Sequence, residues 1–367
     1  MISAALALAL TLAPPQREAY IVTIGDPTLP TTRLGYSFSD TKLPEPKLSP
    51  KLFGDPPQPY QFEWLVGGSG KVDGGFKRRF NVYAQERKET GDKAVLVVRQ
   101  LLRMWDMSVQ RLNYDHNGMY DNHVVTVYLC WGGTAGGEQV FDVEDRLVGT
   151  GKVSVKVNTI YIYDLNSFKD PVEMAREVAH EYGHAILDPV GGFKEPENWG
   201  NGFLGEKLYM RWLRDGLKAK TLEPVDAMGA TAEQLDAWVK KNVDPLEAKI
   251  AKNGPELGLL EGQGQGAMNE YIGLTLYMQT ILPPKVFNST LRDTASTQAK
   301  DYAGAIVRSV ENSASGVVLA IPPAFKKGLW VPVGKCRVAG ASVQQRKGEW
   351  QFIVPGTGAV TLVPPKL

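Results

Sequence analysis

The sequence predicts an α+β fold with a mixed α/β part, a helical part and a small all-β module at the C-terminal end. Three observations lead to this prediction. Strand-like and helix-like stretches alternate from residue 76 to about 190, apolar helical patterns then dominate up to residue 312, and short strand-like stretches separated by Gly and Pro fill residues 313–367. A length of 367 residues, 43% of them hydrophobic, is enough for two or three compact units.

The first 75 residues do not have the pattern of a helical unit. Ile2 to Leu12 form an apolar run that is too short to span a membrane but has the length of a signal-peptide core. We therefore expect residues 1–13 to be a signal peptide, or else a short N-terminal anchor, although no Lys or Arg precedes the run. Ten of the 24 prolines lie between Pro14 and Pro59, which predicts an extended arm of turns and edge strands over residues 14–75.

The α/β part begins with strands and one long helix. Phe62–Val66 and Phe76–Gln85 are typical of strands, since apolar and polar residues alternate in the second. A helix is expected from about Lys93 to Leu112, with its apolar residues on one side. His123–Trp131 and Thr159–Tyr163 are rich in β-branched and aromatic residues and predict buried strands.

A second helix is expected from about residue 171 to 187. Asp170 can cap its N-terminus, Pro171 suits the first helical position, and Glu173 stands three residues after the cap. Apolar residues recur at helical spacing along this stretch, and Gly191-Gly192 follows its end.

This helix carries an H-E-x-x-H motif, His180-Glu181-Tyr182-Gly183-His184. Positions four apart lie on the same face of a helix, so the two imidazoles can bind one Zn²⁺ ion while Glu181 lies beside it, where it can accept a proton from water. A pair of structural histidines is the competing interpretation. The context favours a metal site, because two of the four histidines in the chain lie in this motif, on a capped helix. The chemistry indicated is hydrolysis.

From about Phe80 to Leu213 the order of elements around His180, Glu181 and His184 resembles the gluzincin branch of the zincin metallopeptidases. The resemblance implies a zincin-like catalytic domain over residues 76–312, with an upper α/β part up to about 190 and a helical lower subdomain after it. It also implies that the strand before the motif helix, here Val155–Tyr163, pairs with an extended peptide or protein substrate.

A gluzincin takes its third zinc ligand from a glutamate on a following helix, roughly twenty residues on. Glu206 fits this expectation, because it lies 206 − 184 = 22 residues after His184 in a helical stretch that ends at Gly216. Charged residues mark the solvent side of that helix, and Glu206 lies on the other side, where a buried carboxylate needs a cation. The solvent side is expected to contain Lys207, Arg211, Arg214 and Asp215. The metzincin pattern is excluded, since Leu187 and Val190 stand where it requires Gly and His.

Glu270 is the rival for the third ligand. An asparagine often precedes the gluzincin ligand, and Asn269 precedes Glu270, whereas Gly205 precedes Glu206. Glu195 and Glu197 are less favoured because they lie on a Pro-containing loop.

Glu270 begins an apolar helix that also carries two tyrosines. The resemblance suggests that Tyr271 or Tyr277 stabilises an oxyanion, but a tyrosine in an apolar helix is more often a core residue. Five short strands are expected after this helical part: Val317–Ile321, Gly328–Val333, Ala341–Gln345, Trp350–Val354 and Ala359–Val363.

Charge and cysteine content limit the partners. Lys and Arg number 41 against 40 for Asp and Glu, a balance that indicates neither a nucleic-acid partner nor an anionic membrane. Cys130 and Cys336 could form one disulfide in an oxidising compartment. Asn288-Ser289-Thr290 matches a glycosylation acceptor but is interpreted as an ordinary loop sequence.

The sequence therefore predicts a secreted or cell-envelope zinc metallopeptidase with Glu181 as general base and one catalytic Zn²⁺ on His180, His184 and Glu206. The alternative is a catalytically inactive zincin-fold protein that binds or scaffolds in the cell envelope. The sequence gives no indication of the oligomeric state.

Overall fold

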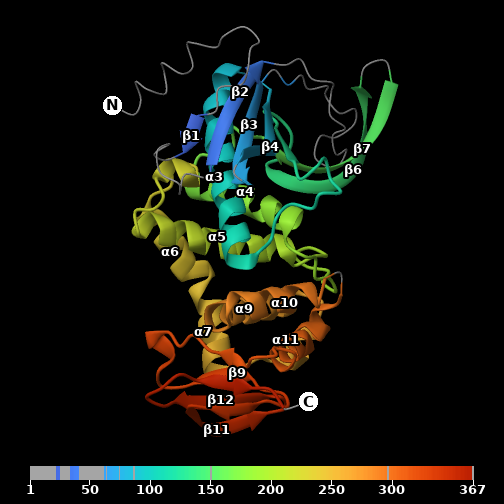
Figure 1. The fold of residues 1–367 in the computed structure, drawn as a ribbon. Coiled ribbons are helices and arrows are strands. Elements are labelled where there is room, and N and C mark those ends of the chain that lie inside the picture. Colours follow the sequence, from blue (N-terminus) through green and yellow to red (C-terminus); the bar gives the residue numbers. More distant parts are fainter. Residues whose placement is uncertain are drawn as a thin grey trace. The chain divides into compact units, whose positions relative to one another are not determined.

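The computed structural model describes residues 22–24, 34–40, 62, 64–73, 75–85, 87–148, 151–295 and 297–365 (Figure 1). They form two compact units. Unit 1 comprises the chain up to residue 106 together with residues 116–178 and 222–230, and unit 2 comprises residues 107–115, 179–221 and 231 onward. The expected signal peptide lies outside the described residues. No helix within the described ranges has both the length and the apolar character needed to cross a membrane.

Unit 1 is built on a seven-stranded sheet. Strands β4, β5 and β7 are parallel to one another, while the other neighbouring strands are antiparallel. The strand order is β1 (Val22–Ile24), β2 (Leu34–Asp40), β3 (Trp64–Val72), β4 (Gly75–Ala84), β5 (Val125–Leu129), β7 (Gly151–Tyr163) and β6 (Gly136–Val148). The strands expected near residues 62–66, 76–85, 123–131 and 159–163 are confirmed, with shifted ends.

The strand before the motif helix is not at the edge of the sheet. Over Asn158–Ile162, β7 pairs with β5 on one side and with β6 on the other. The expectation that Val155–Tyr163 receives a substrate strand is therefore wrong for this part, because both hydrogen-bonding edges are already occupied. The outermost strand beside β7 is β6. The sequence did not predict it, because Gly136–Val148 mixes glycines and acidic residues with its apolar ones.

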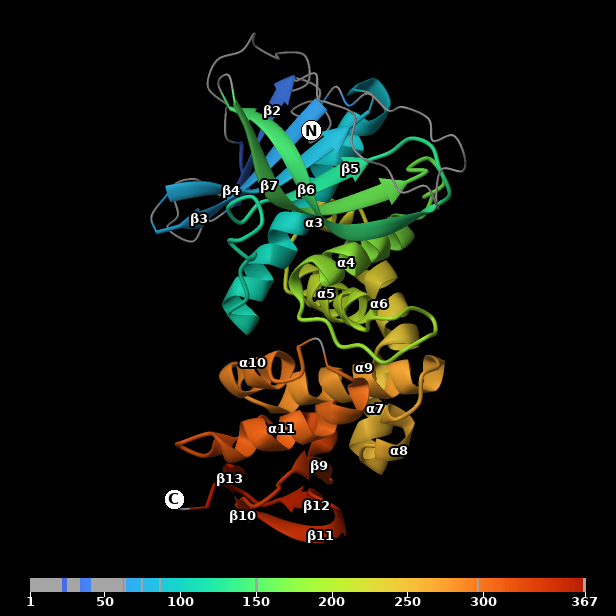
Figure 2. The same cartoon turned by 90° about the vertical axis from the view of Figure 1, so that its right-hand side faces the viewer.

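Helices cover one face of this sheet (Figures 1 and 2). Helix α3 (Arg87–Leu112) packs so close to β3 that a Cβ atom on Gly68 would lie 2.7 Å from Val98 Cγ2. Helix α4 (Pro171–Ile186) joins α3 through a hydrogen bond in which Gln100 donates to the Ala175 carbonyl oxygen at 2.8 Å. Asp170 accepts from the Val172 N–H at 2.9 Å, which confirms the expected N-cap.

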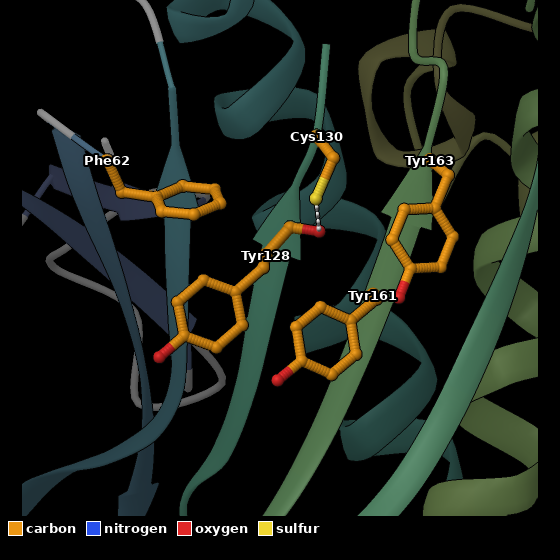
Figure 3. Packing of buried hydrophobic residues seen from close by; sticks show 5 residues of the cluster. All are labelled: Phe62, Tyr128, Cys130, Tyr161 and Tyr163. Atoms are coloured by element: carbon orange, nitrogen blue, oxygen red, sulfur yellow. Dashed lines mark hydrogen bonds between the residues drawn. The ribbon is translucent and has the colours of Figure 1, made fainter. Parts of the chain in front are cut away.

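Aromatic side chains gather on the opposite face of the sheet (Figure 3). Tyr128 and Tyr161, on neighbouring strands, stack with ring centroids 5.3 Å apart, and Phe62 meets Tyr128 edge-on at 5.0 Å. Cys130 lies in the same cluster, where burial raises the pKa of its thiol. Cys130 and Cys336 are both free and buried.

Unit 2 contains helices and two small three-stranded sheets. The helices are α5 (Asn201–Lys218), α6 (Ala232–Asn242), α7 (Asp244–Asn253), α8 (Leu257–Leu260), α9 (Gln265–Ile281), α10 (Pro284–Arg292) and α11 (Tyr302–Glu311). The strands are β8 (Val317–Val318), β9 (Leu329–Pro332), β10 (Arg337–Ala339), β11 (Ala341–Lys347), β12 (Trp350–Pro355) and β13 (Thr361–Val363). The C-terminal β segments are thus confirmed, and they belong to the same unit as the helices before them.

Asn288-Ser289-Thr290 is not a loop but part of α10. Pro284 begins this helix, and Phe287 and Leu291 bury its apolar side. Asn288 is itself buried and donates to the Leu112 carbonyl oxygen. This partner lies far away along the chain, so the local sequence does not indicate the burial of Asn288.

Candidate metal centre

The two histidines lie where α4 and α5 make their closest approach, which glycines permit. A Cβ atom on Gly183 would lie 2.6 Å from the Asn201 carbonyl oxygen, and one on Gly205 would lie 2.4 Å from Gly183 Cα. Gly202 faces His184, since its Cβ would lie 2.2 Å from the imidazole Nε2. The glycine before Glu206 therefore has a packing role, because any larger residue would push the helices apart.

The Nε2 atoms of the two imidazoles face one carboxylate. Glu197 Oε2 lies 3.3 Å from His180 Nε2 and 3.3 Å from His184 Nε2. Each of the three residues offers one ligand atom, and these atoms all lie within 4.8 Å of one another. Two imidazoles and one carboxylate are a donor set that zinc accepts at catalytic sites.

The Nδ1 atoms of both histidines also have hydrogen-bond partners, Asn201 for His184 and Glu206 for His180. Asn201 Nδ2 donates to the Leu187 carbonyl oxygen at 3.1 Å, which leaves Asn201 Oδ1 to accept from His184 Nδ1 at 2.9 Å. Glu206 Oε2 lies 3.4 Å from His180 Nδ1. A proton on each Nδ1 leaves a lone pair on each Nε2, the form in which a neutral imidazole binds a metal.

The structure assigns Glu206 a different position from the expected third ligand. Its carboxylate contacts the Nδ1 side of His180 and the Lys207 ammonium, at 2.6 Å, whereas Glu197 contacts both Nε2 atoms. Helix α5 thus brings Glu206 behind the imidazole, and the loop before α5 brings Glu197 in front of it. The group that could hold a metal is His180, His184 and Glu197.

The loop that carries Glu197 is fixed by backbone hydrogen bonds. The Gly191 N–H donates to the Thr297 carbonyl oxygen at 2.8 Å, and the Lys194 N–H donates to that of Gln263 at 2.7 Å. The loop also closes on itself, through the Gly200 N–H and the Val190 carbonyl oxygen at 2.8 Å. A Pro-containing loop held at these points can position a ligand, and local sequence gives no signal of such distant partners.

Glu270, the rival ligand, has a structural role. It is buried, and its two oxygens accept from Lys249 Nζ at 2.9 Å and from the Glu256 N–H at 2.6 Å. The tyrosines of the same helix occupy core positions. Tyr277 donates to the Trp330 carbonyl oxygen at 2.8 Å, and the ring of Tyr271 is fully buried.

The pKa values of His180 and Glu197 shift in opposite directions. Burial lowers the pKa of His180, but the hydrogen bonds with Glu197 and Glu206 outweigh this effect and raise that pKa to about 10. Burial likewise raises the pKa of Glu197, and the hydrogen bonds from His180 and His184 outweigh it and lower that pKa to about 2. His180 and Glu197 thus stabilise each other in their charged forms.

The surroundings of the group fit a metal ion that water can reach. Glu197 Oε1 is buried and has no hydrogen-bond partner within the described part of the chain. A cation between Glu197 and the imidazoles would satisfy such an oxygen. The side chains of His180, His184 and Glu197 remain 12%, 18% and 24% exposed, so water can reach them. Glu181, next to His180 in the same turn of α4, is buried.

Comparison with known protein families finds no family model that matches the chain, and comparison with curated proteins finds no significant match.

Proposed function

We propose that this protein is a zinc-dependent hydrolase of peptide bonds. The observation that carries the proposal is the convergence of His180 Nε2, His184 Nε2 and Glu197 Oε2 within 4.8 Å, with both Nδ1 atoms held from behind. An ordered set of N, N and O donors is the arrangement of a catalytic zinc site, in which a fourth position stays open. A pair of structural histidines would not require this convergence.

Each residue of the group has a distinct task. His180, His184 and Glu197 would hold the ion, which when bound supplies a Lewis acid that polarises a carbonyl oxygen and makes a nearby water more acidic. Glu181 acts as general base towards the attacking water and later gives the proton to the leaving amine. Asn201 and Glu206 orient the two imidazoles and do not contact the substrate.

Peptide as the substrate class rests on the likeness to gluzincins. The order β5, β6, β7 and the H-E-x-x-H helix α4 supports that likeness. A ligand on the loop before α5, in place of one on that helix, departs from it. Secretion or attachment to the cell envelope is a further part of the proposal and rests on the N-terminal apolar run.

Glu181→Gln tests the proposal against that of an inactive binding or scaffolding protein. We expect about one zinc per chain by elemental analysis in both proteins, because the amide leaves the three ligands in place. Cleavage of a pool of denatured protein should fall by roughly 10²–10⁴-fold, since the amide cannot accept the proton. Wild-type protein that carries zinc but shows no chelator-sensitive cleavage would favour the scaffold.

A further inference from the structure

Lys207 does not lie on the solvent side of α5, as its sequence context had suggested. Its side chain is 12% exposed, and its ammonium lies 2.6 Å from Glu206 Oε1. The same ammonium lies 5.2 Å from the ring centre of Phe203 and 5.4 Å from that of Trp238 on α6. Two aromatic faces and one carboxylate thus hold a mostly buried cation.

These contacts connect Lys207 to the imidazole of His180 in two ways, through Phe203 and through Glu206. Phe203 meets the His180 ring edge-on at 4.8 Å and also lies under Lys207, because residues four apart share a face of α5. Glu206 makes the second connection, because one of its oxygens contacts Lys207 and the other faces His180 Nδ1. The position of Lys207 therefore fixes the carboxylate that orients His180.

We propose that Lys207 is a positioning residue of the metal centre, which acts on His180 through Glu206 and touches neither ion nor substrate. The inference rests on the proposed function, in which His180 is a ligand. Glu206 is a buried carboxylate that contacts both His180 and Lys207. Lys207 Nζ lies 2.6 Å from one of its oxygens, so this contact holds the carboxylate in place beside His180 Nδ1.

Lys207→Met removes the cation but keeps most of the side-chain volume. Competition with a chromogenic chelator should show that zinc affinity falls about 10–100-fold, the usual cost of losing an outer contact to a metal-bound histidine. Lys207→Arg retains a cation over the two rings and should lose less. The matched control is Lys240→Met, since Lys240 pairs with Asp236 but its side chain is 68% exposed. The zinc affinity of the Lys240→Met variant should equal that of the wild type.

A second measurement separates this inference from the metal proposal. The chain has four histidines, so selective ¹⁵N labelling resolves their ring signals in metal-free protein. Lys207→Met should shift the His180 ring signals and leave those of His116 and His123 unchanged. Should Lys207→Met not fold, Trp238→Leu removes one ring from the ammonium without touching Glu206, and the His180 signals should again move.

Failure of the metal proposal and failure of the Lys207 inference give different results. Wild-type protein without zinc affinity would end the metal proposal, while the His180 signals would still decide whether Lys207 positions that ring. Unchanged His180 signals and wild-type zinc affinity in folded Lys207→Met would overturn the inference.

Discussion

Glu197 and Glu206 approach the same imidazole from opposite sides, and this geometry gives them different roles. Glu197 shares its Oε2 atom between two Nε2 atoms, whereas Glu206 divides its oxygens between His180 Nδ1 and Lys207. The convergence of His180 and His184 could be predicted from the sequence, because residues four apart lie about one turn apart on the same face of a helix. The choice between the two glutamates could not be predicted, because it depends on how the loop of Glu197 is anchored to residues far along the chain, Gln263 and Thr297.

Substitution of each glutamate separates a ligand from an orienting residue. Glu206→Gln keeps the shape of the side chain and should weaken zinc binding about 10–100-fold, as expected for an outer contact. Glu197→Gln should weaken it more, since a neutral amide is a poorer ligand than a carboxylate. Chelator competition gives both affinities, with Glu270→Gln as the control because Glu270 contacts Lys249 instead of the histidines. A larger loss in Glu206→Gln than in Glu197→Gln would return Glu206 to the ligand set.

At the scale of elements, the contact between α4 and α5 decides where the ligands lie. Gly183 and Gly205 let the two helices touch, so the residues that flank them, His184 and Glu206, face the same region. The extent of α4 could be predicted because caps and apolar spacing are local signals. The role of Gly205 could not be predicted, because the sequence does not show which neighbouring segment packs against a glycine in a helix.

Alanine at Gly205 tests this contact. The added methyl group would overlap Gly183 Cα, and overpacking of this kind costs about 1–3 kcal/mol of unfolding free energy, measured by urea denaturation of metal-free protein. Gly266→Ala is the matched control, since Gly266 is also in a helix but its Cβ would meet nothing within 4 Å. That change should be neutral or should stabilise by up to about 1 kcal/mol. Equal effects of the two substitutions would mean that the helices can separate at no cost.

At the scale of the whole molecule, the chain divides differently from its sequence pattern. The expected catalytic domain, residues 76–312, contributes to both units, because α3 and α4 each begin in unit 1 and end in unit 2. A helix gives no sign in its sequence that a unit boundary crosses it. The α+β class and the C-terminal strands could be predicted, because both follow from local periodicity. All three candidate ligands belong to unit 2.

Zinc should therefore protect one part of the chain. An ion that joins α4 to the loop of Glu197 must be released before that loop can open, so binding stabilises the closed form by about 2.7 kcal/mol at a concentration of 100 Kd. Hydrogen exchange followed by mass spectrometry should show slower exchange over residues 187–206 when zinc is added. Peptides from β3 and β4, which contain no candidate ligand, serve as the internal reference and should not change. The protection should disappear in His184→Ala, which lacks one ligand. Equal protection in wild type and His184→Ala would place the bound zinc elsewhere.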